Sequence, residues 1–506
     1  MDEQLFSYFP AQKNMFFSPA TLLLFIAGYF ALLLIISRLT SGKADNETFF
    51  IANRNSRWYL VAFGMIGTSI SGVTFISVPG TVKQDAFSYF QFVLGNAVGY
   101  AVIALVLMPI YYRMRLTSIY TYLQHRFGFY SYQSGAFIFL VSRTIGSAFR
   151  LFLVAIVLQH YIFDYWHIPF WITVAVSLLL IWTYTYKGGL KTIIWTDTIQ
   201  TLFLVTAVIL TLIVVGQRMQ LSLAGMVEAI AHSSYSKIFF WDHFTADKRH
   251  FVKYFLGGIA VSVAMTGLDQ DLMQKNLSCR NLRDAQKNMF SFTAVFILVN
   301  LFFLSLGALL YLYAAANHIV LPQRADYLFP EIAFHYLGGM AAIVFILGLT
   351  AATFATTDSA MTALTTSFCV DFLRFSDRPD ASQKRRQIRI RQLVHFIFSL
   401  MFLLVVLFFK YAVNESVVKA VFTVAGYTYG PLLGLFFFGI CTRRQVRDRW
   451  VPWVCVAAPL LCLLLDQYSI QWLWGYRFGF ELLIVNGLIT FAGLWWISSP
   501  QRKAQP

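Results

Sequence analysis

Charged residues are scarce in this chain. They make up 12% of its 506 residues, against about 25% in typical soluble domains, whereas 58% of the residues are hydrophobic. The five cysteines form no CxxC pair or regular framework, and four lie in or at the end of apolar runs, where we interpret them as packing residues. These shortages exclude a soluble domain and a disulfide scaffold, and they predict an all-α, polytopic membrane protein.

Motifs of known catalytic chemistry are also lacking. The sequence contains no HExxH, no P-loop, no Ser/His/Asp triad and no metal-ligand cluster, so we do not expect an enzyme. The net charge of +16 could suggest a nucleic-acid partner. However, the basic residues flank apolar runs, as in KRRQIRIR at 384–391, and this placement is typical of membrane topology rather than nucleic-acid binding.

Long apolar runs dominate what is present. By length and apolarity we predict about thirteen transmembrane helices. Most of the 39 Lys and Arg residues then lie on one side, which places the N-terminus outside and the C-terminus in the cytoplasm of a cell (inner) membrane. The first run follows no basic region or cleavage site, so we expect it to be a retained helix. The expected spans are 19–38, 58–79, 88–110, 134–162, 168–186, 194–216, 251–268, 289–315, 340–371, 393–410, 417–440, 451–466 and 478–498.

Three of these spans are interrupted by glycine or proline. The second reads GMIGTSISGVTFISVPG, the seventh opens FLGG and ends TGLDQDLMQ, and the eleventh reads VAGYTYGPLLG. Interrupted segments at corresponding places in two halves indicate discontinuous helices around a midplane binding site. We therefore expect a peripheral helix and loop (1–57), a first five-helix repeat (58–216), an external connector (217–250), a second, inverted repeat (251–440) and peripheral C-terminal helices with a cytoplasmic tail (441–506).

The ninth span contains an unusually polar stretch, TAATFATTDSAMTALTTS, from Thr350 to Ser367. Nine of its eighteen residues are Ser or Thr, and Asp358 lies in the middle. Hydroxyls in a membrane helix often only bridge neighbouring helices. An ionisable group at membrane depth costs about 2.5–3.5 kcal/mol on insertion scales, so Asp358 indicates a functional site.

Four motifs resemble one known family. They are SISGVTFISVPG (69–80), LTSIYTYLQHRFG (116–128), TYTYKGGLKTIIWTDTIQ (183–200), and ATTDSAMTALTTS (355–367) followed by CVDF. In this order they resemble the sodium:solute symporter family, and they are most similar to its branch of monocarboxylate, iodide and sialic acid carriers. The resemblance implies a leucine-transporter-type fold of ten core helices in two inverted repeats. It also implies a sodium ion between the second and ninth spans.

The resemblance places one ion layer at the first helix break. Matching positions are the carbonyls of Gly67, Ile70 and Ala352, with Ala355 and Thr356. Sodium is a hard cation that prefers oxygen ligands, and a broken helix frees carbonyls for this purpose. This sequence departs from the family pattern at Ala355, where a serine hydroxyl is usual. Either the site is weaker, or water or another group replaces that hydroxyl.

A second ion layer, found in part of the family, lies deeper toward the cytoplasm. Its matching positions are Asp197, Asp358 and Ser359, so one or two sodium ions are implied. Two nearby carboxylates in a low dielectric need a shared cation or a proton. Alternatively, Asp197 only accepts hydrogen bonds from helix ends.

The substrate is expected at the midplane beside the first break. Ser71 and Thr74 follow this break and could bind the substrate by hydrogen bonds. Gln91 on the third span and Tyr427 on the eleventh match the family by region. The Asp269–Gln270 pair ends the seventh span, where capping and gating are equally acceptable roles.

Arg143 and Arg150 are the basic residues that fall well inside a span, and their spacing of seven puts them on one helix face. An arginine fork suits a carboxylate, so one reading is recognition of an anionic substrate. The other reading is an internal ion pair with Asp197, Asp358 or helix-end carbonyls.

The sequence therefore predicts a sodium-coupled secondary active symporter that imports a small organic solute by alternating access. We expect a carboxylate or a sugar- or sialic-acid-like solute, a lipid bilayer as surroundings, a monomer as functional unit, and no nucleic acid. Proton-coupled symport is one alternative, because Ala355 removes a ligand and two carboxylates are available. A non-transporting solute sensor is another, although no signalling domain is evident.

Overall fold

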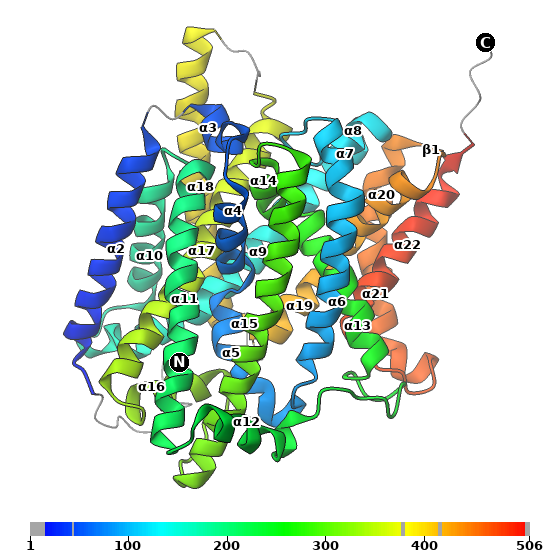
Figure 1. Ribbon diagram of the computed structural model, residues 1–506. Helices are drawn as coiled ribbons and strands as arrows, with labels where there is room; N and C mark the ends of the chain where they lie inside the picture. The colour runs from blue at the N-terminus through cyan, green and yellow to red at the C-terminus, as the bar shows by residue number, and fades with distance from the viewer. Residues whose placement is uncertain (1–15, 43–44, 376–379, 413–416, 501–506) are drawn as a thin grey trace.

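The computed structural model describes residues 16–42, 45–375, 380–412 and 417–500, and most of these residues are helical (Figure 1). Eight helices are long and apolar enough to cross a membrane, two further spans are bent helix pairs, and three apolar helices are shorter. This set matches the expected spans, and the all-α prediction is confirmed. The one sheet within the described residues is a two-stranded pairing of β1 (Gln445–Val446) with β2 (Ser498–Ser499).

The helices follow the order expected for two repeats with peripheral additions. Up to the connector, they are α2 (Pro19–Ser41), α3 (Asn46–Ile51), α4 (Trp58–Ser69), α5 (Gly72–Asp85), α6 (Tyr89–Val102), α7 (Met108–Arg113), α8 (Thr121–Arg126), α9 (Phe129–Tyr161), α10 (Phe170–Thr185) and α11 (Leu190–Arg218). From the connector onward, they are α12 (Leu223–Ala231), α13 (Phe251–Ser262), α14 (Gln270–Leu277), α15 (Leu282–Ala316), α16 (Leu328–His335), α17 (Gly339–Ser367), α18 (Ala381–Ala412), α19 (Val417–Thr428), α20 (Gly430–Cys441), α21 (Val451–Trp472) and α22 (Leu482–Trp496).

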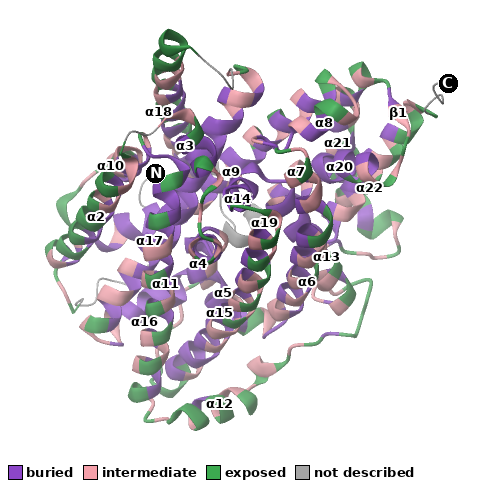
Figure 2. Ribbon diagram, turned by 45° about the horizontal axis from the view of Figure 1, so that its top comes forward, coloured by how far each residue is buried: buried purple, intermediate pink, exposed green. Residues whose placement is uncertain are grey.

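The centre of the bundle is formed by α4, α11 and α17. Helix α11 packs along both α17 and α4, and α17 is buried over most of its length (Figure 2). Helix α2 lies at one edge, and α21 and α22 lie at the opposite edge (Figure 1). Large apolar side chains such as Leu39, Leu404 and Trp453 are exposed on these outer helices, as contact with lipid requires.

The second expected span is broken between α4 and α5, which meet at a bend of 57°. Ile70 ends α4 with φ −89° and ψ 85°, and the extended Ser71 precedes α5. Glycine is required beside this break because the chain passes so close to α17. A Cβ on Gly72 would lie 2.2 Å from Thr353 Oγ1 and 2.8 Å from Val154 Cγ2. The missing side chain thus lets the break pack directly against α17.

The seventh and eleventh spans are also interrupted. Helix α13 runs through a π-helical turn and then bends by 65° into α14. Asp269 caps α14, since its side chain accepts a hydrogen bond from the Asp271 amide. Helix α19 ends at Thr428, and α20 starts two residues later. All three interruptions read from glycine and proline are therefore confirmed.

The two ends of the bundle differ in composition. The predicted connector 217–250 contains α12 and lies at one end (Figure 1). Helices α3 and α8 and the basic start of α18 lie at the other end. These are the segments in which Lys and Arg are concentrated, so the charge asymmetry read from the sequence corresponds to opposite ends of the structure.

Candidate functional site

The first break lies against the polar stretch of α17 and against α11. The Gly67 amide donates a hydrogen bond of 2.9 Å to Thr201 Oγ1 on α11. A Cβ on Gly67 would lie 3.5 Å from the Ala355 Cβ on α17. The two segments proposed to share an ion are thus in direct contact, which sequence alone could not establish.

The upper layer fits a hard cation only in part. At the end of α4 the last carbonyls lack the amides that a continuing helix would supply. Thr356 donates its hydroxyl hydrogen to the Thr353 carbonyl at 2.8 Å, which leaves its oxygen lone pairs available. Ala355 contributes no hydroxyl, but the Thr68 hydroxyl lies 3.4 Å from the Ala355 carbonyl. Carbonyls and one or two hydroxyls of this kind suit sodium.

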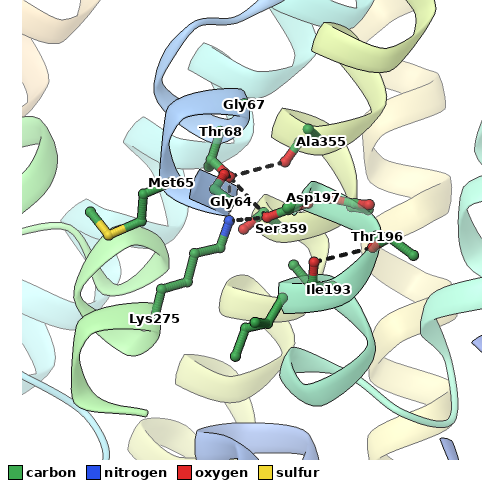
Figure 3. Close-up of polar contacts among 12 residues, drawn as sticks. Gly64, Met65, Gly67, Thr68, Ile193, Thr196, Asp197, Lys275, Ala355 and Ser359 are labelled. Atoms are coloured by element: carbon green, nitrogen blue, oxygen red, sulfur yellow. Dashed lines mark hydrogen bonds and ion pairs between the residues drawn. The ribbon is translucent and has the colours of Figure 1, made fainter. Parts of the chain in front are cut away.

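The lower layer contains a lysine that sequence reasoning did not select. Lys275 of α14 points toward α4 and α11, where its Nζ forms an ion pair with Asp197 Oδ2 and donates to Thr68 Oγ1 (Figure 3). The Thr68 hydroxyl lies 3.1 Å from the same carboxylate oxygen. Lys275 and Asp197 are 1% and 0% exposed, so this is a buried, charge-paired centre.

The other residues predicted for the lower layer have different partners. Tyr184 donates a 2.7 Å hydrogen bond to Asp358 Oδ2, and Ser359 donates to Asp271 Oδ1 on α14. Within the described residues, Asp358 Oδ1 has no hydrogen-bond partner. Asp197, Asp358 and Ser359 therefore each contact a different group in this conformation.

A cavity lies beside the first break, as expected for a substrate site. Ser71, Thr74, Arg143 and Arg150 line it, and these four were selected from the sequence. The lining also includes polar and aromatic residues that sequence reasoning missed, among them Asn96, Ser262, Thr266, Tyr89 and Tyr100. Asn96 and Ser262 lie within apolar helices, and a polar residue at membrane depth was the signal that could have found them.

The two arginines of α9 have different surroundings. Arg143 forms an ion pair with Asp271, and its Nη1 lies 3.7 Å from Asp269 Oδ2. Neither Asp197 nor Asp358 is its partner, so that part of the sequence interpretation is corrected. No carboxylate of the described residues lies within ion-pair distance of Arg150, and both arginines line the cavity.

Tyr427 does not line the cavity. Its hydroxyl donates to Asp466 of α21 at 2.7 Å. Instead, Tyr429 donates a 2.6 Å hydrogen bond to Asp269, the carboxylate that caps α14. The sequence match was therefore two residues away from the tyrosine that reaches the second break.

Both selected glutamines hold backbone segments in place. Gln91 donates to the Arg249 carbonyl at 2.9 Å and accepts from the Phe240 amide at 3.1 Å, so it fixes the connector. Gln270 accepts from the Ile119 amide at 2.9 Å and donates to a carbonyl of the same loop. Because their amides are used in this way, and neither lines the cavity, a direct substrate contact is not supported in this conformation.

Comparison with known proteins places this arrangement in a family. The model of the sodium:solute symporter family matches residues 49–448. The sodium/sialic acid symporter NanT of Aliivibrio fischeri is 24% identical over 88% of each chain. The human sodium/iodide cotransporter is 24% identical over 82% of this chain and 65% of its own length.

Solved structures share the fold. A Na+-coupled sialic acid symporter in a substrate-bound outward-open state superposes with a TM-score of 0.79 at 18% identity, covering 94% of this chain and 96% of the other. Mhp1, a nucleobase-cation-symport-1 family transporter, gives a TM-score of 0.54 at 13% identity, covering 90% and 95%. With its broken helices, buried charges and cavity, the chain belongs to the sodium:solute symporter family and is a membrane protein that couples solute transport to sodium.

Proposed function

We propose that this symporter imports a small organic anion, and that Arg150 binds the negatively charged group. The observation that carries this proposal is the contrast on α9. Arg143 has carboxylate partners, whereas Arg150 lines the same cavity without one among the described residues. A cation at membrane depth is costly unless it pairs or faces a watery cavity. An incoming carboxylate would supply the missing partner in a forked, two-bond geometry.

The cavity lining supports a polar substrate. Hydroxyl groups of Ser71 and Thr74 from α5 and of Thr266 from the second break lie beside Asn96. Relatives by name carry sialic acid, iodide and monocarboxylates, and all of these solutes are anions. A carboxylate or an acidic sugar fits both the arginine and the hydroxyl-bearing lining.

For sodium we propose the upper layer. The ligands would be the carbonyls of Gly67, Ile70 and Ala352 with the Thr356 hydroxyl, and Ala355 would be the weak point. Asp358, in the next turn of α17, would add a negative charge nearby. Contact between the break and α17 supports this assignment, because the ligands come from both segments.

Sodium binding would hold the break against α17, order the start of α5 and so complete the substrate site. Rocking of the broken-helix bundle against the remaining helices would then expose both solutes to the cytoplasm. We propose that the N-terminus is outside and that a monomer suffices. Each sodium charge crossing the membrane contributes about 2.3 kcal/mol per 100 mV to accumulation.

Uptake into proteoliposomes tests the coupling. An inward sodium gradient should drive substrate accumulation, and Thr356→Ala and Asp358→Asn should reduce it. Uptake that follows pH and ignores sodium would replace this proposal by proton coupling. Ligand binding without any uptake would instead indicate a sensor.

A thermal-shift screen tests the substrate class. Sialic acid, lactate, pyruvate and iodide would be compared with neutral sugars and amino acids, each in sodium chloride and in choline chloride. Anions should stabilise the wild type, and only when sodium is present. Arg150→Gln should lose this response and Arg150→Lys should keep part of it. A neutral ligand that still stabilises Arg150→Gln would contradict the anion proposal.

A further inference from the structure

The lower ion layer already contains a positive charge that belongs to the protein. Lys275 Nζ contacts the Asp197 carboxylate and the Thr68 hydroxyl, and Thr68 in turn lies 3.4 Å from the Ala355 carbonyl. A carboxylate, a hydroxyl and a nearby carbonyl are the oxygen types that would bind sodium. The ammonium thus takes the position at which the lower cation would be bound (Figure 3).

A sodium ion and this ammonium exclude one another. Two like charges a few ångströms apart in a low-dielectric interior repel strongly, and Lys275 is 1% exposed. Nor do the remaining lower-layer groups offer another position together, since Asp358 accepts from Tyr184 and Ser359 donates to Asp271. The residues expected for the lower layer therefore do not fit a second sodium ion.

Charge balance supports the same reading. Asp197 and Asp358 are both fully buried beside this centre. Lys275 compensates Asp197, whereas Asp358 keeps one oxygen without a partner among the described residues. Buried charges require compensation, so one negative charge is left for one mobile cation.

We propose that Lys275 permanently replaces the lower sodium ion, so that this symporter binds and moves one sodium ion per cycle. This inference rests on the sodium coupling proposed above, and it adds the stoichiometry of that coupling. It assigns Lys275 as a positioning residue of the cation site. The difference from a two-sodium transporter is written in α14, which carries the ammonium into the contact between α4 and α11.

The test is a sodium titration of the purified full-length protein, read as thermal stabilisation and as intrinsic tryptophan fluorescence. Wild type should respond to sodium with a Hill coefficient of about 1, and Lys275→Met should move it toward 2 because Asp197 becomes free for a second ion. Lys275→Arg should behave as wild type. Lys287→Met serves as the matched control, since this lysine is exposed at the same end of the bundle.

The double variant Lys275→Met/Asp197→Asn covers the case in which Lys275→Met alone does not fold. It removes both charges and should keep the wild-type response with a Hill coefficient of about 1. A wild-type coefficient near 2, an unchanged coefficient in folded Lys275→Met, or loss of the sodium response in the double variant would each overturn the inference. A wild type that ignores sodium altogether would instead overturn the proposed coupling.

Discussion

The two broken spans bend by similar angles, 57° and 65°, but they differ in chemistry. The first break, Ser69 to Ser71, carries no ionisable side chain and packs against alanine and threonine of α17. The second break introduces Asp269, Asp271 and Lys275, each bound to an oppositely charged group or to a hydroxyl. The repeat therefore supplies the same geometry twice, with a neutral break suited to a mobile cation and a charged break that fastens helices together.

The largest effect should come from removing charge at the second break. Arg143→Met would leave Asp271 and Asp269 buried without their cation, and breaking such a pair costs about 3–5 kcal/mol. Thermal unfolding should show a strong loss of stability. Arg150→Met is the matched control, because it removes a cation that has no carboxylate partner among the described residues. Equal losses in both variants would remove the distinction between the two arginines.

The packing of the first break predicts a smaller but clear effect. Gly72→Ala would push a methyl group into Thr353 and Val154, and overpacking of this kind costs about 1–3 kcal/mol. Unfolding and sodium binding should both suffer. Gly28→Ala on α2, where no atom lies within 4 Å of the added carbon, should be close to neutral. A Gly72→Ala protein as stable as wild type would show that the break does not pack tightly against α17.

Adding a ligand to the neutral break should strengthen sodium binding. Ala355→Ser restores a hydroxyl facing Gly67, and a hydrogen-bond-sized contribution of about 1 kcal/mol corresponds to roughly a fivefold gain in affinity. Thr356→Ala should shift affinity in the opposite direction. Sodium-dependent fluorescence would measure both. If Ala355→Ser leaves the affinity unchanged, the upper layer does not hold the ion.

The smallest effect concerns the connector that joins the two repeats. Partial burial raises the pKa of Asp247, but hydrogen bonds and the charge of Arg249 outweigh it, so the pKa is lowered. A lowered pKa means that Asp247 stabilises the connector above its unfolded pKa near 3.8, and that this contribution is lost as pH falls through the lower folded value.

Because this pair is largely exposed, the contribution should stay below about 1 kcal/mol. Hydrogen exchange of residues 242–250, corrected for intrinsic rates, should rise at low pH in wild type. In Asp247→Asn the exchange should be high already at neutral pH. A pH response that persists unchanged in Asp247→Asn would assign it to another group.

Sequence patterns predicted the spans and breaks because both follow from local chemistry. Apolar length determines what can cross a bilayer, and glycine and proline mark the places where a helix stops. Ser71, Thr74, Arg143 and Arg150 follow the first break or share one face of α9, so local periodicity was enough to bring them to the cavity.

The partners of the buried charges could not be predicted in the same way. Lys275 follows the seventh span and resembled a topology-setting charge, yet the bend after α13 turns it inward to Asp197, 78 residues away in sequence. Asp271 and Lys275, four apart, share one face of α14, which was the available signal. Gln91 and Gln270 could not be distinguished from substrate ligands without seeing which backbone groups occupy them.

Helix α14 is short, but every one of its eight residues is buried and its polar side chains bind several neighbours. Gln270 binds the loop before α8, Asp271 binds α9 and α17, Gln274 donates to α17, and Lys275 binds α4 and α11. A small displacement would break several of these bonds together, so partial movement is costly while a full change of partners is not. The inner half of this helix should therefore switch between discrete positions in an all-or-none manner, and one bound ion can then bias the whole transition.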